Sequence, residues 1–189
     1  MGSITPQNKP PTGWPTTVQQ HSPKRVKNLL VTGRPGTGKT TIVESIVRKF
    51  AKDTGGFLTT EIRERGVRKG FKIVTLDGKT GILAHVEISS PVRVGKYGVD
   101  LKSLESVAVP AVQGAVEHKK IVLIDEIGRM EIASEEFRRC VLSALDSDRV
   151  VLATIQRHAH PFTDAIRGRA DAKVVAVTVE NRSAVREAV

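Results

Sequence analysis

The stretch GRPGTGKT, from Gly33 to Thr40, decides the fold of this chain. It fits the pattern G-x-x-x-x-G-K-[ST] of a phosphate-binding loop, in which glycines let the backbone curl so that its N–H groups face phosphate oxygens. We expect Lys39 to reach the β- and γ-phosphates of a nucleotide and the Thr40 hydroxyl to bind Mg²⁺. The predicted nucleotide-binding residues of the loop are Gly33, Arg34, Pro35, Gly36, Thr37, Gly38, Lys39 and Thr40.

The sequence on either side of this loop supports the same interpretation. The apolar run Val26–Thr32 has the length of a buried strand. After the loop, apolar residues recur at helical spacing at Ile42, Val43, Ile46 and Val47. Strand, glycine loop and helix form the order that phosphate binding needs, because the start of the helix adds the positive end of its dipole. The structural alternative is a glycine turn that opens an ordinary helix.

Length and composition indicate one domain with an aliphatic core. The chain has 189 residues, of which 39% are hydrophobic and 4% aromatic. Residues 1–24 are rich in Pro, Thr, Ser and Gln and have no periodicity, so we expect a disordered tail followed by a domain over residues 25–189. The sequence holds a single cysteine, Cys140, and neither a long apolar run nor a signal-peptide core. We therefore expect a cytoplasmic, monomeric protein that does not span a membrane.

The net charge of +10 suits a ligand made of phosphates and also suits nucleic acid. The Lys and Arg residues are scattered, and few aromatics are present to stack on bases. We therefore favour nucleoside triphosphates as the ligand and keep nucleic acid as an alternative.

The segment after the first helix predicts an inserted β-meander. Three apolar runs follow one another at Phe57–Ile62, Phe71–Leu76 and Gly81–Ile88, with the turn signal Asp77-Gly78 between the second and the third. Three consecutive strands depart from a βαβ rhythm, so this region is expected to extend the edge of the sheet.

The remaining chain alternates buried strands with helices. A glycine-punctuated loop is expected at Val94–Val99, and a helix from Pro110 to about His118, because proline fits the first position of a helix and disfavours helix at the residue before it. Apolar runs at 121–124, 150–155 and 173–179 alternate with helices begun by Ser134, near Phe162–Arg167 and from Asn181. The prediction is an α/β fold with a mostly parallel sheet flanked by helices.

Asp125-Glu126, at the end of an apolar strand, turns nucleotide binding into a hypothesis of hydrolysis. In P-loop proteins an Asp at this place holds Mg²⁺, and a Glu after it can polarise water for attack on the γ-phosphate. We therefore predict Thr40 and Asp125 as metal ligands, with Lys39 and Glu126 as catalytic residues. The pair also favours a sheet in which one strand lies between the loop strand and the Asp strand. The alternative is two acids where a strand meets solvent.

A second cation is expected to stabilise the transition state, because an arginine finger contributes about 10³–10⁵ in rate. The candidates are Arg63, Arg65, Arg129 and Arg157. Arg129 follows the Asp-Glu pair by three residues, and Arg157 follows the next strand, at the sheet edge where such sites form. We select Arg129 and Arg157 as catalytic candidates, with a solvated surface arginine as the alternative for each. For His85 and Glu87 we prefer a structural or lid role over metal binding.

Longer motifs carry a resemblance to a known family. They are the loop with its second threonine (Gly33–Thr41), GFLTTEIRERGVRKGF (Gly56–Phe71), TLDGKTGILAHV (Thr75–Val86), KYGVDLKSLE (Lys96–Glu105), IDEIGRME (Ile124–Glu131), LATI (Leu152–Ile155) and TVENR (Thr178–Arg182). Over about residues 26–182 the chain resembles the THEP1 family of nucleoside-triphosphatases, relatives of the human cancer-related nucleoside-triphosphatase.

The resemblance implies Mg²⁺-dependent hydrolysis of ATP, GTP and other nucleoside triphosphates to diphosphate and phosphate, with loose base preference, on a RecA-like fold. By position, it implies that the phosphates and magnesium are held by Gly36, Gly38, Lys39, Thr40 and Thr41. It further implies that Asp125 contacts the metal, that Glu126 is the base, and that Asn181 and Arg182 lie beside the nucleobase. The family often has Lys in place of Arg129, and the tail has no counterpart in the family.

Two other functions stay open at this point. A nucleoside or nucleotide kinase would need an arginine-rich lid, and no separate one stands out, although residues 61–72 hold Arg63, Arg65, Arg68 and Lys69. An RNA-linked ATPase, or a binding module that responds to nucleotides, is suggested by the charge of +10.

Overall fold

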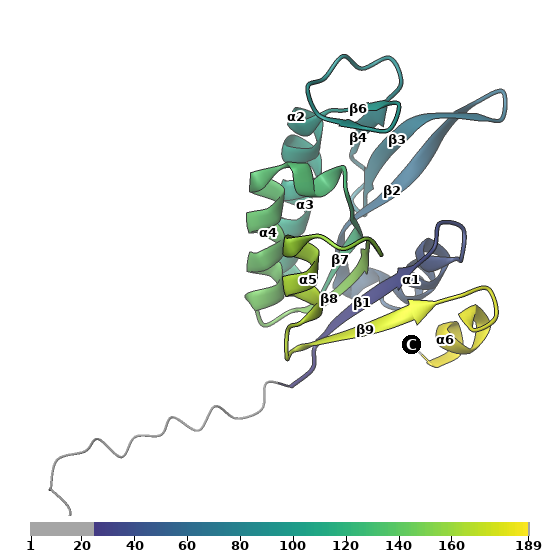
Figure 1. The fold of residues 1–189 in the computed structure, drawn as a ribbon. Coiled ribbons are helices and arrows are strands. Elements are labelled where there is room, and N and C mark those ends of the chain that lie inside the picture. Colours follow the sequence, from purple (N-terminus) through teal and green to yellow (C-terminus); the bar gives the residue numbers. More distant parts are fainter. Residues whose placement is uncertain (1–24, 189) are drawn as a thin grey trace, which may run out of the picture.

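A mixed sheet of nine strands forms the centre of the computed structural model, which describes residues 25–188. The predicted tail at 1–24 lies outside the described residues. The strand order is β5-β6-β4-β3-β2-β7-β8-β1-β9 (Figure 1). The parallel part consists of β2 (Thr54–Glu64), β7 (Ile121–Ile127), β8 (Val150–Ile155), β1 (Asn28–Gly33) and β9 (Ala172–Val177).

The order of these strands confirms the insertion expected from the Asp-Glu pair. β8 lies between β1, which leads into the phosphate loop, and β7, which ends in Asp125-Glu126. The central strands are buried on both sides: Leu30, Val31, Leu123 and Ile124 are fully buried. Near-continuous apolar runs of this kind are typical of parallel strands that helices cover on both faces.

The meander is present and larger than expected. β2 pairs in parallel with β7 at its start and antiparallel with β3 (Val67–Thr75) along its length, and β3 pairs with β4 (Thr80–His85). The expectation of a loop at Val94–Val99 was wrong, because β5 (Arg93–Val94) and β6 (Tyr97–Val99) form a hairpin. Gly95, at φ 59°, makes the tight turn, and the burial of Tyr97 and Val99 stabilises so short a strand.

Helices cover both faces of the sheet (Figure 1). α3 (Val109–His118), α4 (Glu135–Asp146) and α5 (Pro161–Arg167) lie on one face, while α1 (Lys39–Lys49) and α6 (Arg182–Ala188) lie on the other. Two hydrophobic clusters result: Phe57 and Phe137 belong to the larger one, and Ile42 and Leu152 to the smaller. No helix of the described residues is long and apolar enough to cross a membrane.

The helix expected to open at Pro110 begins nine residues earlier, so that expectation was wrong. α2 (Leu101–Ser103), a π-helical segment (Leu104–Ala108) and α3 follow one another without a break. Asp100 caps the start, since its side chain accepts a hydrogen bond from the N–H of Ser103 at 2.9 Å. Leu104 is fully buried, as is Ala108, and tertiary packing of this kind outweighs the local preference of the residue before a proline.

Other local predictions hold. The Ser134 hydroxyl accepts a hydrogen bond from the N–H of Phe137 at 3.0 Å and so caps α4. Cys140 lies in the core, where burial raises the pKa of its thiol to about 11. The core interpretation of this cysteine is therefore confirmed.

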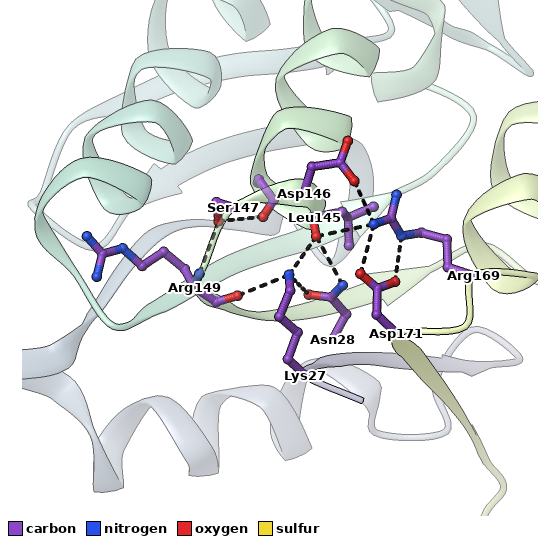
Figure 2. Close-up of polar contacts among 9 residues, drawn as sticks. Lys27, Asn28, Leu145, Asp146, Ser147, Arg149, Arg169 and Asp171 are labelled. Carbon is purple, nitrogen blue, oxygen red and sulfur yellow. Dashed lines mark hydrogen bonds and ion pairs between the residues drawn. The ribbon is translucent and has the colours of Figure 1, made fainter. Parts of the chain in front are cut away.

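A polar network ties the elements together at the end of the sheet where β1, β8 and β9 begin (Figure 2). The Leu145 carbonyl, near the end of α4, accepts hydrogen bonds from Lys27 Nζ at 2.6 Å and from Asn28 Nδ2 at 3.3 Å. Arg169 binds Asp171 through two nitrogens, at 2.8 and 2.9 Å, and Asp146 at 2.6 Å. This network lies at the opposite end of the strands from Asp125-Glu126.

Candidate active site

A cavity of about 900 Å³ opens at the carboxyl ends of the parallel strands. The phosphate loop, the ends of β7 and β8, and the meander all contribute to its walls. Its lining includes Gly33, Arg34, Pro35, Gly36, Lys39, Thr40, Asp125, Glu126, Arg129, Glu131, Gln156 and Arg157. Ligands of open α/β sheets bind at this edge, because the loops there can converge on one site.

The phosphate loop has the backbone shape that its glycines predict. Gly36 and Gly38 have φ of 79° and 98°, a region that side chains disfavour, and Gly38 stands directly before α1. The Lys39 ammonium donates a hydrogen bond to the Gly33 carbonyl at 3.3 Å and so lies across the loop. The Thr37 hydroxyl donates to the Arg34 carbonyl at 2.9 Å, so this side chain shapes the loop.

Asp125 is held by two threonines from different elements. Thr40 Oγ1, on α1, donates a hydrogen bond to Asp125 Oδ2 at 3.1 Å, and Thr154 Oγ1, on β8, donates to Oδ1. Asp125 is 3% exposed, and burial raises the pKa of its carboxyl, while these hydrogen bonds and the charge of Lys39 oppose the rise. Residues 40 and 125, predicted as metal ligands, are thus brought together.

Glu126 lies next to Asp125 on the cavity wall. Burial raises the pKa of its carboxyl, the Lys39 ammonium lowers it, and the charge of Asp125 raises it further. A carboxyl with a raised pKa beside a phosphate loop is suited to accept a proton.

The arginine candidates separate into two groups. Arg129 and Arg157 line the cavity, whereas Arg63 and Arg65 lie outside it, at the end of β2 and on the exposed turn after it. Within the described residues, the ion pairs of arginine are formed by others: Arg48, Arg63, Arg68, Arg139, Arg167 and Arg169. Arg129 and Arg157 therefore remain as cavity cations without a carboxylate partner in that part of the chain.

A second, smaller cavity of about 250 Å³ lies beside the loop, lined by Gly38, Thr41, Ile42, Arg182, Ser183 and Arg186. Arg182 Cδ lies 3.8 Å from the place that a Cβ on Gly38 would occupy. Asn181 lines neither cavity; its side chain accepts a hydrogen bond from Thr178 N at 2.8 Å and donates to the Ala176 carbonyl at 2.9 Å. Asn181 therefore shapes the turn that presents Arg182.

Comparisons with known proteins agree with this geometry. The profile of a protein family described as NTPase matches residues 28–189. The chain belongs to the THEP1 family of nucleoside-triphosphatases. It is similar to nucleoside-triphosphatase THEP1 of Thermotoga sp. (strain RQ2), with 46% identity over 82% of this chain and 88% of that protein. THEP1 of Thermofilum pendens is 47% identical over 82% of this chain and 89% of the relative.

Two solved structures share the fold of this chain. The crystal structure of THEP1 from Aquifex aeolicus matches with a TM-score of 0.79 and 36% identity, over 85% of this chain and 95% of that one. The solution structure of a human cancer-related nucleoside triphosphatase matches with a TM-score of 0.73 and 37% identity, over 86% of this chain and 94% of that one. The predicted family and fold class are thereby confirmed.

Three residues of this site could not be singled out from the sequence. Thr154 holds Asp125, Gln156 lines the cavity at 6% exposure, and Glu131 lines it while 4% exposed. Thr154 and Glu131 stand inside the family motifs LATI and IDEIGRME, which offered a signal, but neither motif says which side chains meet. His85, by contrast, contacts Glu87 at 3.9 Å outside the cavity, and the described residues hold no group of three or more potential metal ligands.

Proposed function

We propose that this THEP1 protein hydrolyses nucleoside triphosphates to diphosphate and phosphate, with Mg²⁺ and broad base tolerance. The observation that carries the proposal is the meeting of Thr40 and Asp125, at 3.1 Å, with Lys39 and Glu126 in the wall of one cavity. The names of the relatives, which are nucleoside-triphosphatases, support it.

The phosphates bind in the loop, where backbone N–H groups and the start of α1 attract negative charge. Lys39, whose ammonium donates a hydrogen bond to the Gly33 carbonyl across the loop, contacts the β- and γ-phosphates. The nucleobase lies at the smaller cavity, where Arg182 stacks on it and Thr41 lies beside the phosphates. A guanidinium plane stacks on any base, so few contacts remain that distinguish adenine from guanine.

The oxygens of Thr40 and Asp125 fit Mg²⁺, because a hard cation takes one or two protein oxygens and completes its shell with substrate phosphate oxygens and water. When bound, the ion neutralises charge that develops on the phosphates. The hydrogen bonds from Thr40 and Thr154 keep the carboxylate of Asp125 oriented for that role.

Glu126 activates the attacking water. The water oxygen bonds to the γ-phosphorus, the bond from that phosphorus to the bridging oxygen breaks with its electron pair going to the diphosphate, and Glu126 takes the proton. Lys39, together with Arg129 or Arg157, stabilises the negative charge of the transition state.

A kinase is the second candidate, because the cavity continues beyond the phosphate loop. Its far end is lined by apolar side chains, namely Phe71, Leu83, Val94 and Met130. A second substrate that offers a hydroxyl there would accept the phosphoryl group in place of water. At the same end, the Arg68 guanidinium is held by Glu61 at 2.8 Å and by the Tyr97 hydroxyl at 3.1 Å.

Phosphate release from ATP, GTP, CTP and UTP with Mg²⁺ tests the proposal. We expect release from all of them without any acceptor, and no large effect of RNA. Fast transfer to a nucleoside with little phosphate release would indicate the kinase instead. Turnover that needs RNA, and falls steeply with salt, would indicate an RNA-linked ATPase.

The variant Lys39→Ala probes the loop directly. We expect weaker nucleotide binding and no measurable hydrolysis, because the contact of Lys39 with the β- and γ-phosphates is lost. Titration with a fluorescent nucleotide and a phosphate-release assay measure the two effects. Lys49→Ala, at the exposed end of α1, serves as the control for loss of one lysine charge. Hydrolysis by Lys39→Ala at the wild-type rate would exclude this loop as the active site.

A further inference from the structure

Glu131 is a buried carboxyl group that the proposed reaction does not use. It begins the short 3₁₀ turn Glu131–Ala133 after β7, is 4% exposed and lines the catalytic cavity. Burying a carboxyl group is costly unless it is hydrogen-bonded or paired with a cation. None of the ion pairs among residues 25–188 includes it.

Its hydrogen bond leads to the loop after the Asp-Glu pair. Glu131 Oε2 accepts a hydrogen bond from the N–H of Gly128 at 3.2 Å. Gly128 in turn packs against Glu126. A Cβ placed on Gly128 would lie 2.9 Å from Glu131 Oε2, and 3.4 and 3.5 Å from Cγ and Cδ of Glu126. Gly128 therefore lies between the two carboxyl side chains, and the Glu131 carboxyl group leaves no room for a side chain at this position.

We propose that Glu131 is a positioning residue for hydrolysis: through Gly128 it fixes the carboxyl group of Glu126 and the loop that carries Arg129. The proposal rests on the proposed function, because the position of Glu126 matters to turnover only if Glu126 activates water. It adds a positioning role for Glu131, the buried acid at the end of the IDEIGRME motif.

The electrostatics of the site agree with this role. Burial and the neighbouring charge of Glu126 raise the pKa of Glu131 to about 8. The raised pKa favours the neutral form of this carboxyl group, which adds less negative charge beside a bound triphosphate than a carboxylate would. Its carbonyl oxygen still accepts the hydrogen bond from Gly128, which is the contact that positioning requires.

Substitutions at Glu131 and Gly128 change the contact between these two residues in different ways. Glu131→Gln keeps an acceptor of the same reach and stays neutral, whereas Glu131→Ala removes the acceptor and opens space beside Gly128. Gly128→Ala keeps Glu131 but places a methyl group 2.9 Å from Glu131 Oε2, so the Glu131 carboxyl group must shift from its position beside the Gly128 N–H. Glu135→Ala, an exposed residue in the first turn of α4, is the matched control.

Steady-state phosphate release with ATP and Mg²⁺ tests the proposal, with circular dichroism to check folding. We expect kcat of Glu131→Ala and of Gly128→Ala to fall on the order of 10- to 100-fold with KM nearly unchanged, because the attack geometry is disturbed while the phosphate loop is not. Glu131→Gln should keep most of the wild-type kcat, and Glu135→Ala all of it.

Three results would overturn the proposal. The first is an unchanged kcat in Gly128→Ala. This result contradicts the proposal even if Glu131→Ala does not fold. The second is a Glu131→Gln variant that folds and loses as much kcat as Glu131→Ala. The third is a loss that resides in KM alone. In each case an active wild-type protein leaves the proposed function standing, whereas a wild-type protein that releases no phosphate removes both.

Discussion

Asp125 is held by hydroxyl groups on both of its oxygens, one from the helix after the phosphate loop and one from the neighbouring strand. The Thr40 hydroxyl also serves the expected metal site, so it cannot orient Asp125 alone once an ion binds. Thr154 supplies the hydrogen bond that remains. On one side of β8, Thr154 pairs with Val31 of β1. On the other side, Ala153 pairs with Ile124 of β7, so the strand register places Thr154 beside Asp125.

Thr154→Val should weaken the binding of Mg²⁺, because valine lacks the hydroxyl that orients Asp125. The side chain keeps nearly the same shape. We expect the Mg²⁺ concentration for half-maximal hydrolysis to rise by about tenfold, a factor typical of outer-shell partners of a metal ligand. Saturating Mg²⁺ should restore most of kcat. Thr163→Val, at a buried threonine on α5, is the control. An unchanged Mg²⁺ dependence would contradict the role of Thr154.

Glu131 gives a second prediction at this scale, on stability. Its carboxyl pKa is about 8 in the folded protein against an ordinary 4.5, so the folded state keeps a proton that the unfolded chain releases. The contribution of this group to stability therefore falls as the pH rises between these values, by at most about 1.4 kcal/mol per pH unit. Glu131→Gln should lose this slope and gain stability relative to wild type toward pH 8. Urea denaturation at several pH values measures the free energy of unfolding of both proteins. If these free energies changed with pH in the same way in wild type and Glu131→Gln, Glu131 would be charged in the folded state and the prediction would be wrong.

At the scale of elements, the network of Figure 2 joins the start of β1, the end of α4 and the segment that leads into β9. The backbone carbonyl of Asp171 accepts hydrogen bonds from Lys27 N and Asn28 N, and its side chain binds Arg169. This arrangement stabilises the end of the sheet that is remote from the cavity of about 900 Å³. We therefore expect its disruption to change stability and not the affinity for nucleotide.

Asp171→Asn tests this separation. The Arg169 guanidinium lowers the pKa of the Asp171 carboxyl, so this contribution to stability is present above the ordinary value of 3.8 and is lost as the pH falls below it. We expect the free energy of unfolding of the variant to be lower by about 1–3 kcal/mol at neutral pH, because Arg169 loses its charged partner at residue 171 and keeps its other contacts. The difference from wild type should shrink in acid. Urea denaturation at several pH values measures this difference in the free energy of unfolding. Glu117→Gln, at the surface, is the control for removing one carboxylate. A neutral-pH difference near zero would contradict the stabilising role.

At the scale of the whole molecule, the parallel core and the phosphate loop could be predicted because local signals agree there. Apolar β-formers bounded by glycines and acids mark β1, β7 and β8. Local patterns do not predict the hairpin β5–β6 or the early start of the helix before Pro110. Both depend on the burial of Tyr97 and Leu104 in the folded protein, which a local sequence pattern does not show. The contacts of Thr154 and Glu131 arise between residues far apart in sequence or across a loop, so no local sequence pattern predicts them.

In the proposed function, one cavity between the phosphate loop, the strand ends and the meander performs hydrolysis with Glu126 as the base. The most direct test is a single-turnover measurement of γ-phosphate release from ATP by Glu126→Gln, beside its affinity for ATP. We predict that the affinity stays close to wild type, because the amide keeps the size of the side chain. The rate should fall by about 10²–10⁴-fold, since the amide cannot take the proton. Release of phosphate by Glu126→Gln at the wild-type rate would contradict the claim.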